Sequence, residues 1–136
     1  METHAYLLDT NIISALVREP GGVVYSALKS RLPARVCTSI IVAAEIEFGL
    51  YKSGSQRLRK QVETILSGID VLPLQTPVHR HYGEIRAYLQ NIGQPIGLND
   101  LFIAAQAQAL GLIMVTGNVA EFERVPGLTV ENWLIR

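Results

Sequence analysis

Short strand-like runs alternate with longer helical segments along the whole chain, and this alternation restricts the possible fold more than any other feature. Strands are predicted at residues 5–8, 35–38, 71–74 and 112–115, with a weaker one at 128–130. Parallel strands need a crossover connection, usually a helix, whereas antiparallel strands can be joined by a tight turn. The sequence therefore predicts an α/β fold with a mostly parallel sheet.

The segments between these strands have helical patterns. We predict helices at residues 9–17, 23–31, 39–52, 56–66, 77–91, 98–110 and 119–122. The segment 98–110 is apolar on nearly every side, which is typical of a buried helix, and Gly111 follows it as a helix terminator. We expect this helix to lie in the centre of the fold.

Length and composition limit the class of protein. The 136 residues suit one domain spanning 1–136, and 49% hydrophobic against 18% charged residues excludes a disordered chain. Cys37 is the only cysteine, which excludes a disulfide-built domain. No apolar run is long enough for a membrane span, and the N-terminus lacks an export signal, so we expect a cytoplasmic protein. The formal net charge is zero, so any nucleic-acid partner must be held by a local patch, a partner chain or a metal ion.

Polar residues gather where the predicted strands end. Asp9, Thr10 and Asn11 follow the first strand, Ser39 the second, and Thr116 and Asn118 the fourth. Glu45 lies in the helix after the second strand, and Asp100 in the opening of the predicted helix 98–110. Considered alone, each residue has a simpler interpretation as an ordinary helix cap or a solvated acid. Because the carboxyl ends of parallel strands lie along one edge, where such sheets bind ligands, we expect the group to form one site.

Three acids in this group suggest a metal site. Asp100 is the only charge between Arg86 and Glu121, and Glu45 lies in an apolar helix where a carboxylate is costly unless it is paired or metal-bound. Glu47 is an alternative to Glu45, and periodicity does not choose between them. Converging carboxylates repel one another, and a hard cation relieves that repulsion. Oxygen-only donors suit Mg²⁺ or Mn²⁺, ions that serve phosphate chemistry.

Four sequence blocks resemble the PIN-domain family. They are residues 7–14 with Asp9, residues 39–49 with Glu45, residues 95–105 with Asp100, and residues 115–127 with Thr116 and Asn118. The blocks occur in the family's order at fitting intervals and span essentially the whole chain. They are most similar to the VapC branch, the toxin halves of VapBC toxin–antitoxin pairs.

The resemblance implies a single PIN domain with a five-stranded parallel sheet flanked by helices. It implies an endoribonuclease dependent on Mg²⁺ or Mn²⁺ that cleaves structured RNA, such as tRNA or rRNA loops. It also implies a homodimer, and a cognate VapB-type antitoxin that blocks the cleft and through which alone the complex binds operator DNA.

Residue roles follow as a hypothesis. Asp9 and Asp100 would hold the metal ion, and Glu45 would complete its shell or orient the attacking water, leaving a 5′-phosphate and a 3′-hydroxyl. The residues around them would aim the carboxylates: Thr10, Asn11, Ser39, Thr116 and Asn118. Many PIN domains have a fourth acid where this chain has Asn118, and Glu121 is a candidate substitute.

Two other functions compete with this hypothesis. A PIN fold kept as a catalytically weak interaction scaffold would explain the uncharged Asn118. A haloacid-dehalogenase-like phosphatase also has an aspartate after its first strand, but it needs a second acid where this chain has Asn11, and a lysine near the later acids. A basic cluster, Lys52, Arg57, Arg59 and Lys60, is interpreted as a solvated helix face rather than an RNA-binding patch.

Overall fold

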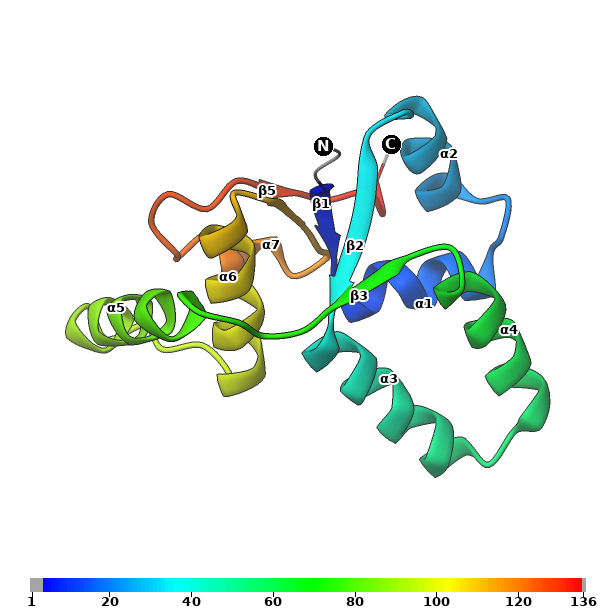
Figure 1. Ribbon diagram of the computed structural model, residues 1–136, viewed down its shortest axis with the longest axis horizontal. Coiled ribbons are helices and arrows are strands. Elements are labelled where there is room, and N and C mark those ends of the chain that lie inside the picture. The colour runs from blue at the N-terminus through cyan, green and yellow to red at the C-terminus, as the bar shows by residue number, and fades with distance from the viewer. Residues whose placement is uncertain (1–3, 136) are drawn as a thin grey trace.

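The computed structural model describes residues 4–135, which form one five-stranded sheet with helices around it (Figure 1). The strands are β1 (His4–Leu8), β2 (Arg35–Ser39), β3 (Asp70–Leu72), β4 (Ile113–Val115) and β5 (Val130–Glu131). Every neighbouring pair is parallel, in the order β3-β2-β1-β4-β5. The predicted α/β class and five-stranded sheet are confirmed, and the sheet is parallel throughout.

The helices occur in the predicted order. They are α1 (Thr10–Arg18), α2 (Val23–Ser30), α3 (Ile40–Ser53), α4 (Gln56–Leu66), α5 (Val78–Asn91), α6 (Leu98–Leu110) and α7 (Val119–Phe122). Their ends match the prediction to within a residue, because Asp9, Ser39 and Pro77 lie at N-cap positions just outside the helices. The ends of the predicted domain, residues 1–3 and 136, lie outside the described residues.

Two strands differ from the prediction by more than one residue at an end. The third was predicted at 71–74 but ends at Leu72. Pro73 has no N–H for a ladder hydrogen bond, and the buried Gln106 donates its Nε2 to the carbonyls of Leu72 and Pro73, at 3.2 and 3.1 Å. The last strand, predicted at 128–130, is Val130–Glu131, because these are the residues that pair with Met114 and Val115 of β4.

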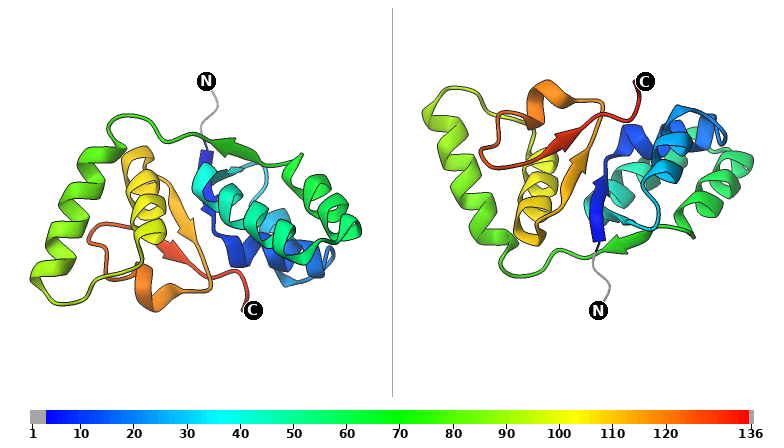
Figure 2. Two further views of the ribbon diagram at one scale, coloured as in Figure 1. Left: turned by 90° about the horizontal axis from the view of Figure 1, so that it is seen from below. Right: turned by 90° about the horizontal axis from the view of Figure 1, so that it is seen from above.

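The strand order reverses at β1. The chain runs from β1 outward through β2 to β3, and then returns to place β4 on the other side of β1. Figure 2 shows the consequence, with α1 to α4 on one side of β1 and α5 to α7 on the other. The amide of Asp9 donates to the carbonyl of Val115 at 2.9 Å, so the ends of β1 and β4 are tied together. Ligands of parallel sheets bind at such a reversal, beyond the carboxyl ends of the strands.

The core lies between the sheet and its helices. Leu7 and Leu8 of β1 are fully buried, as is Cys37 of β2, and Trp133 buries its ring near the end of the described chain. Helix α6 is buried through its middle, from Leu101 to Ala107, as predicted, but Leu98 and Leu110 at its ends are about half exposed. The buried middle of α6 gives a fixed base for the polar residues of its first turn.

Within the described residues, no helix combines the length and the apolar character that crossing a bilayer requires.

Candidate active site

Asp9 follows β1 and caps helix α1. Its Oδ1 accepts a hydrogen bond from the Thr10 amide at 2.8 Å, and its Oδ2 accepts one from Thr116 Oγ1 at 2.7 Å. The side chain is only 5% exposed. Burial raises the pKa of Asp9 above its usual value, against the lowering effect of these two hydrogen bonds, and the charges of Glu45 and Glu121 raise it further. Asp9 is therefore a fixed carboxylate that gains from a nearby cation.

The side chain of Glu45, on α3, points toward the region of Asp9 and Thr10. Its Oε1 accepts a hydrogen bond from Thr10 Oγ1 at 2.7 Å, so Thr10 bonds to both acids. The alternative acid, Glu47, points elsewhere and pairs with Arg59 of α4 at 2.7 Å. The structure thus resolves the choice that periodicity left open: Glu45 lies in the site and Glu47 on a helix surface.

Asp100 lies in the first turn of α6 and also faces Asp9 and Glu45. Burial, a hydrogen bond with Glu121 and the charge of Glu121 raise the pKa of Asp100 to about 7, and the charges of Asp9 and Glu45 contribute. Three acids from separate parts of the chain, Glu121, Asp9 and Glu45, therefore act on the ionisation of Asp100. Electrostatic repulsion between neighbouring carboxylates is relieved when a divalent cation binds.

Glu121 of α7 reaches this acidic group. Its Oε1 accepts a hydrogen bond from the Gly97 amide at 3.1 Å, and its Oε2 accepts one from Asn118 Nδ2. Sequence reasoning identified Glu121 only as a candidate substitute for the fourth acid. The structure brings it beside Asp100 because α7 begins directly after Asn118, so that Asn118 supplies a hydrogen bond and Glu121 the charge.

The other predicted polar residues support the backbone around the acids. Asn11 accepts a hydrogen bond from the Gly117 amide at 2.9 Å, which ties the start of α1 to the loop after β4. Ser39 accepts one from the Ile41 amide at 3.1 Å and caps α3, the helix that carries Glu45. Neither makes a hydrogen bond to a carboxylate among residues 4–135, unlike Thr10 and Thr116. Both roles are visible only in the folded chain.

Most of these residues line one cleft of about 410 Å³ at the carboxyl edge of the sheet, which we call the acidic cleft. Ser39, Thr116 and Glu121 are not part of its lining. Its lining residues are Asp9, Thr10, Asn11, Ser14, Arg18, Glu45, Asp100, Asn118 and Leu134. Arg18 is the only cation in this lining, within the part of the chain that the structure describes. The three predicted acids therefore converge on one cavity, as the sequence implied.

The cleft suits a hard divalent ion bound with water. Among residues 4–135, no three acidic, histidine or cysteine side chains are placed to hold a metal ion together. Mg²⁺ does not need one, because it keeps several water molecules and binds through one or two carboxylates together with substrate phosphates. The oxygen-only donors of the cleft and the raised pKa values of Asp9 and Asp100 fit such an ion.

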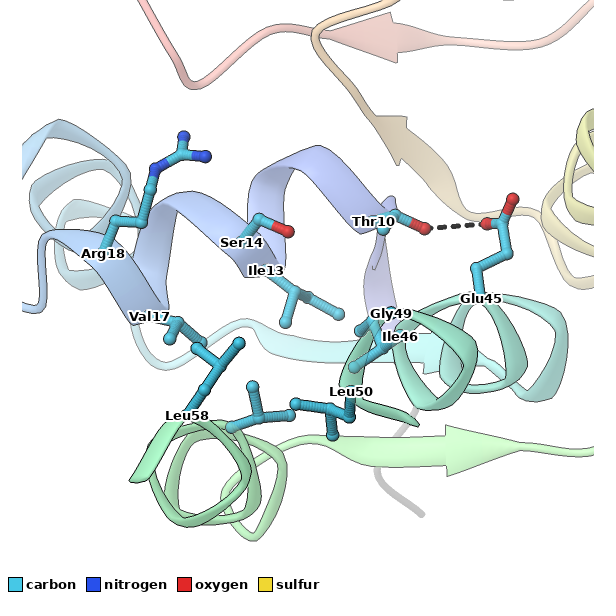
Figure 3. A pocket seen from close by; sticks show the side chains of 11 residues that line it. Thr10, Ile13, Ser14, Val17, Arg18, Glu45, Ile46, Gly49, Leu50 and Leu58 are labelled. Carbon is cyan, nitrogen blue, oxygen red and sulfur yellow. Dashed lines mark hydrogen bonds between the residues drawn. The ribbon is translucent and has the colours of Figure 1, made fainter. Parts of the chain in front are cut away.

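A second cavity adjoins the acidic cleft. This apolar hollow of about 330 Å³ lies between α1, α3 and α4, and its apolar lining residues are Ile13, Val17, Ile46, Leu50, Leu58 and Val62. Thr10, Ser14, Arg18 and Glu45 line both cavities, so the two are continuous. Figure 3 shows the aliphatic side chains directed into the hollow and the Thr10–Glu45 hydrogen bond at its edge.

Arg59 of the basic cluster and Arg86 of α5 lie outside the cleft. Arg59 of the basic cluster pairs with Glu47 and lies over the Tyr51 ring at 5.1 Å. Arg86 donates a hydrogen bond to the Tyr82 hydroxyl at 3.0 Å on α5. None of these residues belongs to the lining of the acidic cleft.

Comparison with known proteins gives one consistent family. A sequence model described as "PIN domain" matches residues 6–128. The chain is 38% identical to "Ribonuclease VapC2" of Haemophilus influenzae over 130 residues, which is 95% of this chain and 98% of that protein. It is 41% identical to "tRNA(fMet)-specific endonuclease VapC" of Salmonella typhimurium over 101 residues, 74% of this chain and 76% of that protein.

Solved structures agree with the sequence matches. The fold is similar to a chain in the crystal structure of VapBC2 from Rickettsia felis bound to a DNA fragment from their promoter, with a TM-score of 0.87 and 32% identity. The match covers 95% of this chain and 98% of that chain. These similarities are to PIN and VapC proteins, and they favour the nuclease fold over the haloacid-dehalogenase alternative.

Proposed function

The chain belongs to the PIN-domain family, within its VapC branch of toxin ribonucleases, and from this premise we propose that it is an Mg²⁺- or Mn²⁺-dependent endoribonuclease that cleaves structured RNA. The observation that carries the proposal is the convergence of Asp9, Glu45 and Asp100 on one cleft at the carboxyl edge of the sheet. Glu121, hydrogen-bonded to the Asn118 side chain, adds a fourth carboxylate beside Asp100.

Each acid has a role that follows from its surroundings. Asp9 and Asp100 would hold the metal ion, because they lie in the cleft lining and both have raised pKa values. Glu45 would complete the ion's coordination or orient water, held in place by Thr10 Oγ1. A bound Mg²⁺ lowers the pKa of the water molecule that it coordinates and stabilises the charge that develops on the phosphate oxygens.

The hydroxyl groups around the acids position them for this chemistry. Thr116 donates to Asp9 Oδ2, which leaves the other lone pairs of that carboxylate for a cation. Thr10 donates its amide to Asp9 and its hydroxyl to Glu45, so it sets the direction of both. Hydrogen bonds of this kind around metal ligands fix their orientation. Hydrolysis in this cleft would leave a 5′-phosphate and a 3′-hydroxyl.

We propose a structured RNA, such as a tRNA, as the substrate. A relative 41% identical to this chain is named for cleavage of tRNA(fMet). An RNA substrate and a promoter-binding partner both imply action in the cytoplasm.

We propose a VapB-type antitoxin as the partner, bound in the apolar hollow next to the acidic cleft. The related structure from Rickettsia felis is a VapBC complex on promoter DNA. The hollow offers an aliphatic floor of about the size that one or two side chains of a partner would fill, and it opens into the cleft. A partner seated there would also cover the acids, and operator DNA would be bound through that partner alone. A homodimer would use the exposed aromatic residues of α3, Phe48 and Tyr51, which are 71% and 76% exposed.

The test is cleavage of total RNA by the purified protein in Mg²⁺. We expect discrete fragments with 5′-phosphates, which should disappear with EDTA and with Asp9→Ala. The control is Asp70→Ala, because Asp70 lies on the exposed edge strand β3, outside the cleft lining. Unchanged cleavage by Asp9→Ala, or in EDTA, would refute the proposal.

The scaffold alternative rests on the uncharged Asn118. Its support weakens because Glu121 brings a carboxylate next to that side chain. A scaffold would show no Mg²⁺-dependent rise in melting temperature, whereas a binding site stabilises the fold as the ion saturates it.

A further inference from the structure

Helix α1 carries a row of polar side chains that leads out of the acidic cleft. Thr10, Ser14 and Arg18 are spaced four residues apart, so they lie along one side of the helix. All three line both the acidic cleft and the apolar hollow. Figure 3 shows them in succession along α1, with the guanidinium of Arg18 directed away from the aliphatic side chains. The row therefore connects Thr10, which holds Glu45, to a cation at the cleft rim.

Arg18 is exposed and has no structural partner. Its side chain makes no ion pair, hydrogen bond or ring contact with any of residues 4–135. Two other arginines of the described chain are held in ion pairs: Arg31 with Glu131, and Arg59 with Glu47. The guanidinium of Arg18 is thus free to bind a ligand, and its planar set of donors suits two oxygens of one phosphate.

The negative charge of the cleft lining explains why RNA binding there would need a positively charged side chain. Asp9, Glu45 and Asp100 line the cavity and repel an approaching phosphate chain, and the chain has no net positive charge to offset them. Arg18 follows Thr10 by eight residues, which is about 12 Å along the helix. A phosphate bound by Arg18 would therefore lie away from the metal ion, and Arg18 would not compete with that ion for the reacting phosphate.

We propose that Arg18 binds a flanking phosphate of the RNA and holds the strand across the acidic cleft. This inference rests on the proposed function for its substrate class. The contact is to the backbone, so it contributes affinity and positioning without reading the base sequence.

The test compares Arg18→Ala and Arg18→Lys with Arg80→Ala, a matched exposed arginine on α5 outside the cleft lining. Binding to end-labelled unfractionated tRNA is measured in Ca²⁺ at several salt concentrations, and cleavage in Mg²⁺ gives KM and kcat separately. Arg18→Ala should raise Kd and KM about tenfold, with kcat within about twofold of the wild type. It should also reduce the slope of log Kd against log salt by about 1.

The controls separate charge from structure. Arg18→Lys should keep the salt slope because it keeps the charge, and Arg80→Ala should change neither constant. A merely structural role for Arg18 would lower the melting temperature and leave the salt slope unchanged. The inference is overturned if Arg18→Ala matches wild type in Kd and slope, or if Arg80→Ala changes them equally.

The outcomes also separate this inference from the proposed function. Cleavage in Mg²⁺ with a KM that does not respond to Arg18→Ala contradicts the inference and supports the nuclease. RNA binding that depends on Arg18, by a wild-type protein that cleaves no RNA, supports the inference and contradicts the nuclease.

Discussion

The acidic cleft and the apolar hollow share four lining residues, but their linings favour different kinds of ligand. In the cleft, the pKa values of Asp9 and Asp100 are raised because burial and neighbouring charges oppose their ionisation. In the hollow, aliphatic side chains such as Ile13 and Leu50 surround a space of about 330 Å³. The cleft gains from a cation and the hollow from an apolar partner.

Helix α1 forms a wall of both regions. Its polar row of Thr10, Ser14 and Arg18 lines both cavities, and Ile13 and Val17 line only the hollow. One amphipathic helix therefore joins the proposed metal site to the proposed antitoxin site. A partner in the hollow would lie within reach of the acids, which provides a direct means of inhibition.

The comparison predicts opposite stability effects in the two regions. In the cleft, Asp100→Asn should reduce cleavage at least about hundredfold, since the loss of even an outer positioning residue costs about 10–100-fold. The same change should raise the melting temperature of the metal-free protein at pH 8, because it removes a charge from a repulsive group. Thermal melts and cleavage assays check both effects.

The control for Asp100 is Asp70→Asn. A hydrogen bond with His4, with help from Arg35, holds the pKa of Asp70 below its usual value, so this carboxylate stabilises the fold when ionised. Its substitution should lower the melting temperature and leave cleavage unchanged. If both aspartate variants shift the melting temperature in the same direction, the contrast between a functional and a structural carboxylate fails.

In the hollow, Leu50→Ala should destabilise the fold by about 2–5 kcal/mol, because Leu50 is only 5% exposed and its loss enlarges an existing space. Urea unfolding measures this loss, and the cleavage rate per folded molecule should stay within about twofold. Leu32→Ala, the same substitution at a 63% exposed leucine outside the lining of the hollow, is the control and should stay within about 0.5 kcal/mol of the wild type. A large loss of cleavage by folded Leu50→Ala would show that the two regions are not independent.

A smaller effect is expected from the hydroxyl that orients Asp9. Thr116→Val removes the donor to Asp9 Oδ2 with little change in shape, and should weaken Mg²⁺ binding about 10–100-fold. Calorimetric titration with Mg²⁺ measures the change. Thr64→Val on the exposed side of α4 is the control, since Thr64 Oγ1 donates only to the Lys60 carbonyl. Equal Mg²⁺ affinity of Thr116→Val and the wild type would remove Thr116 from the site.

The last prediction concerns pH. The folded-state pKa of Asp100 is about 7, above the value of 3.8 for an unperturbed aspartate. Its contribution to the stability of the metal-free protein is therefore fully present below about pH 3.8 and is lost as pH rises through about 7. Urea unfolding between pH 4.5 and 8 should show the wild type losing stability relative to Asp100→Asn, and a constant difference would contradict this pKa.

Much of the fold was predictable because it depends on local patterns. Helices α4, α6 and α7 have the predicted bounds, since apolar spacing and caps such as Ser55 and Gly111 act within a few residues. The short edge strands were misplaced because pairing partners and the hydrogen bonds of Gln106 decide where they end.

The candidate site was also predictable in part from the sequence. Asp9 stood out because it follows a strand of a parallel sheet. Asp100 stood out because it is the only charge between Arg86 and Glu121 and opens a helix that the pattern predicts to be buried. The choice of Glu45 over Glu47 depended on Arg59, a residue of another helix that pairs with Glu47. The approach of Glu121 to Asp100 depended on the position of α7 after β4, which no local pattern reports.

Periodicity and residue type settled the helix–strand alternation and the oxygen-rich chemistry of the cleft, because both arise from neighbours along the chain. Only the folded arrangement settled which carboxylates meet, where the hollow opens and why Arg18 is left without a partner. These features depend on contacts between residues far apart in sequence, such as Asp9 with Thr116 and Thr10 with Glu45, and such contacts exist only when the sheet brings the ends of its strands together.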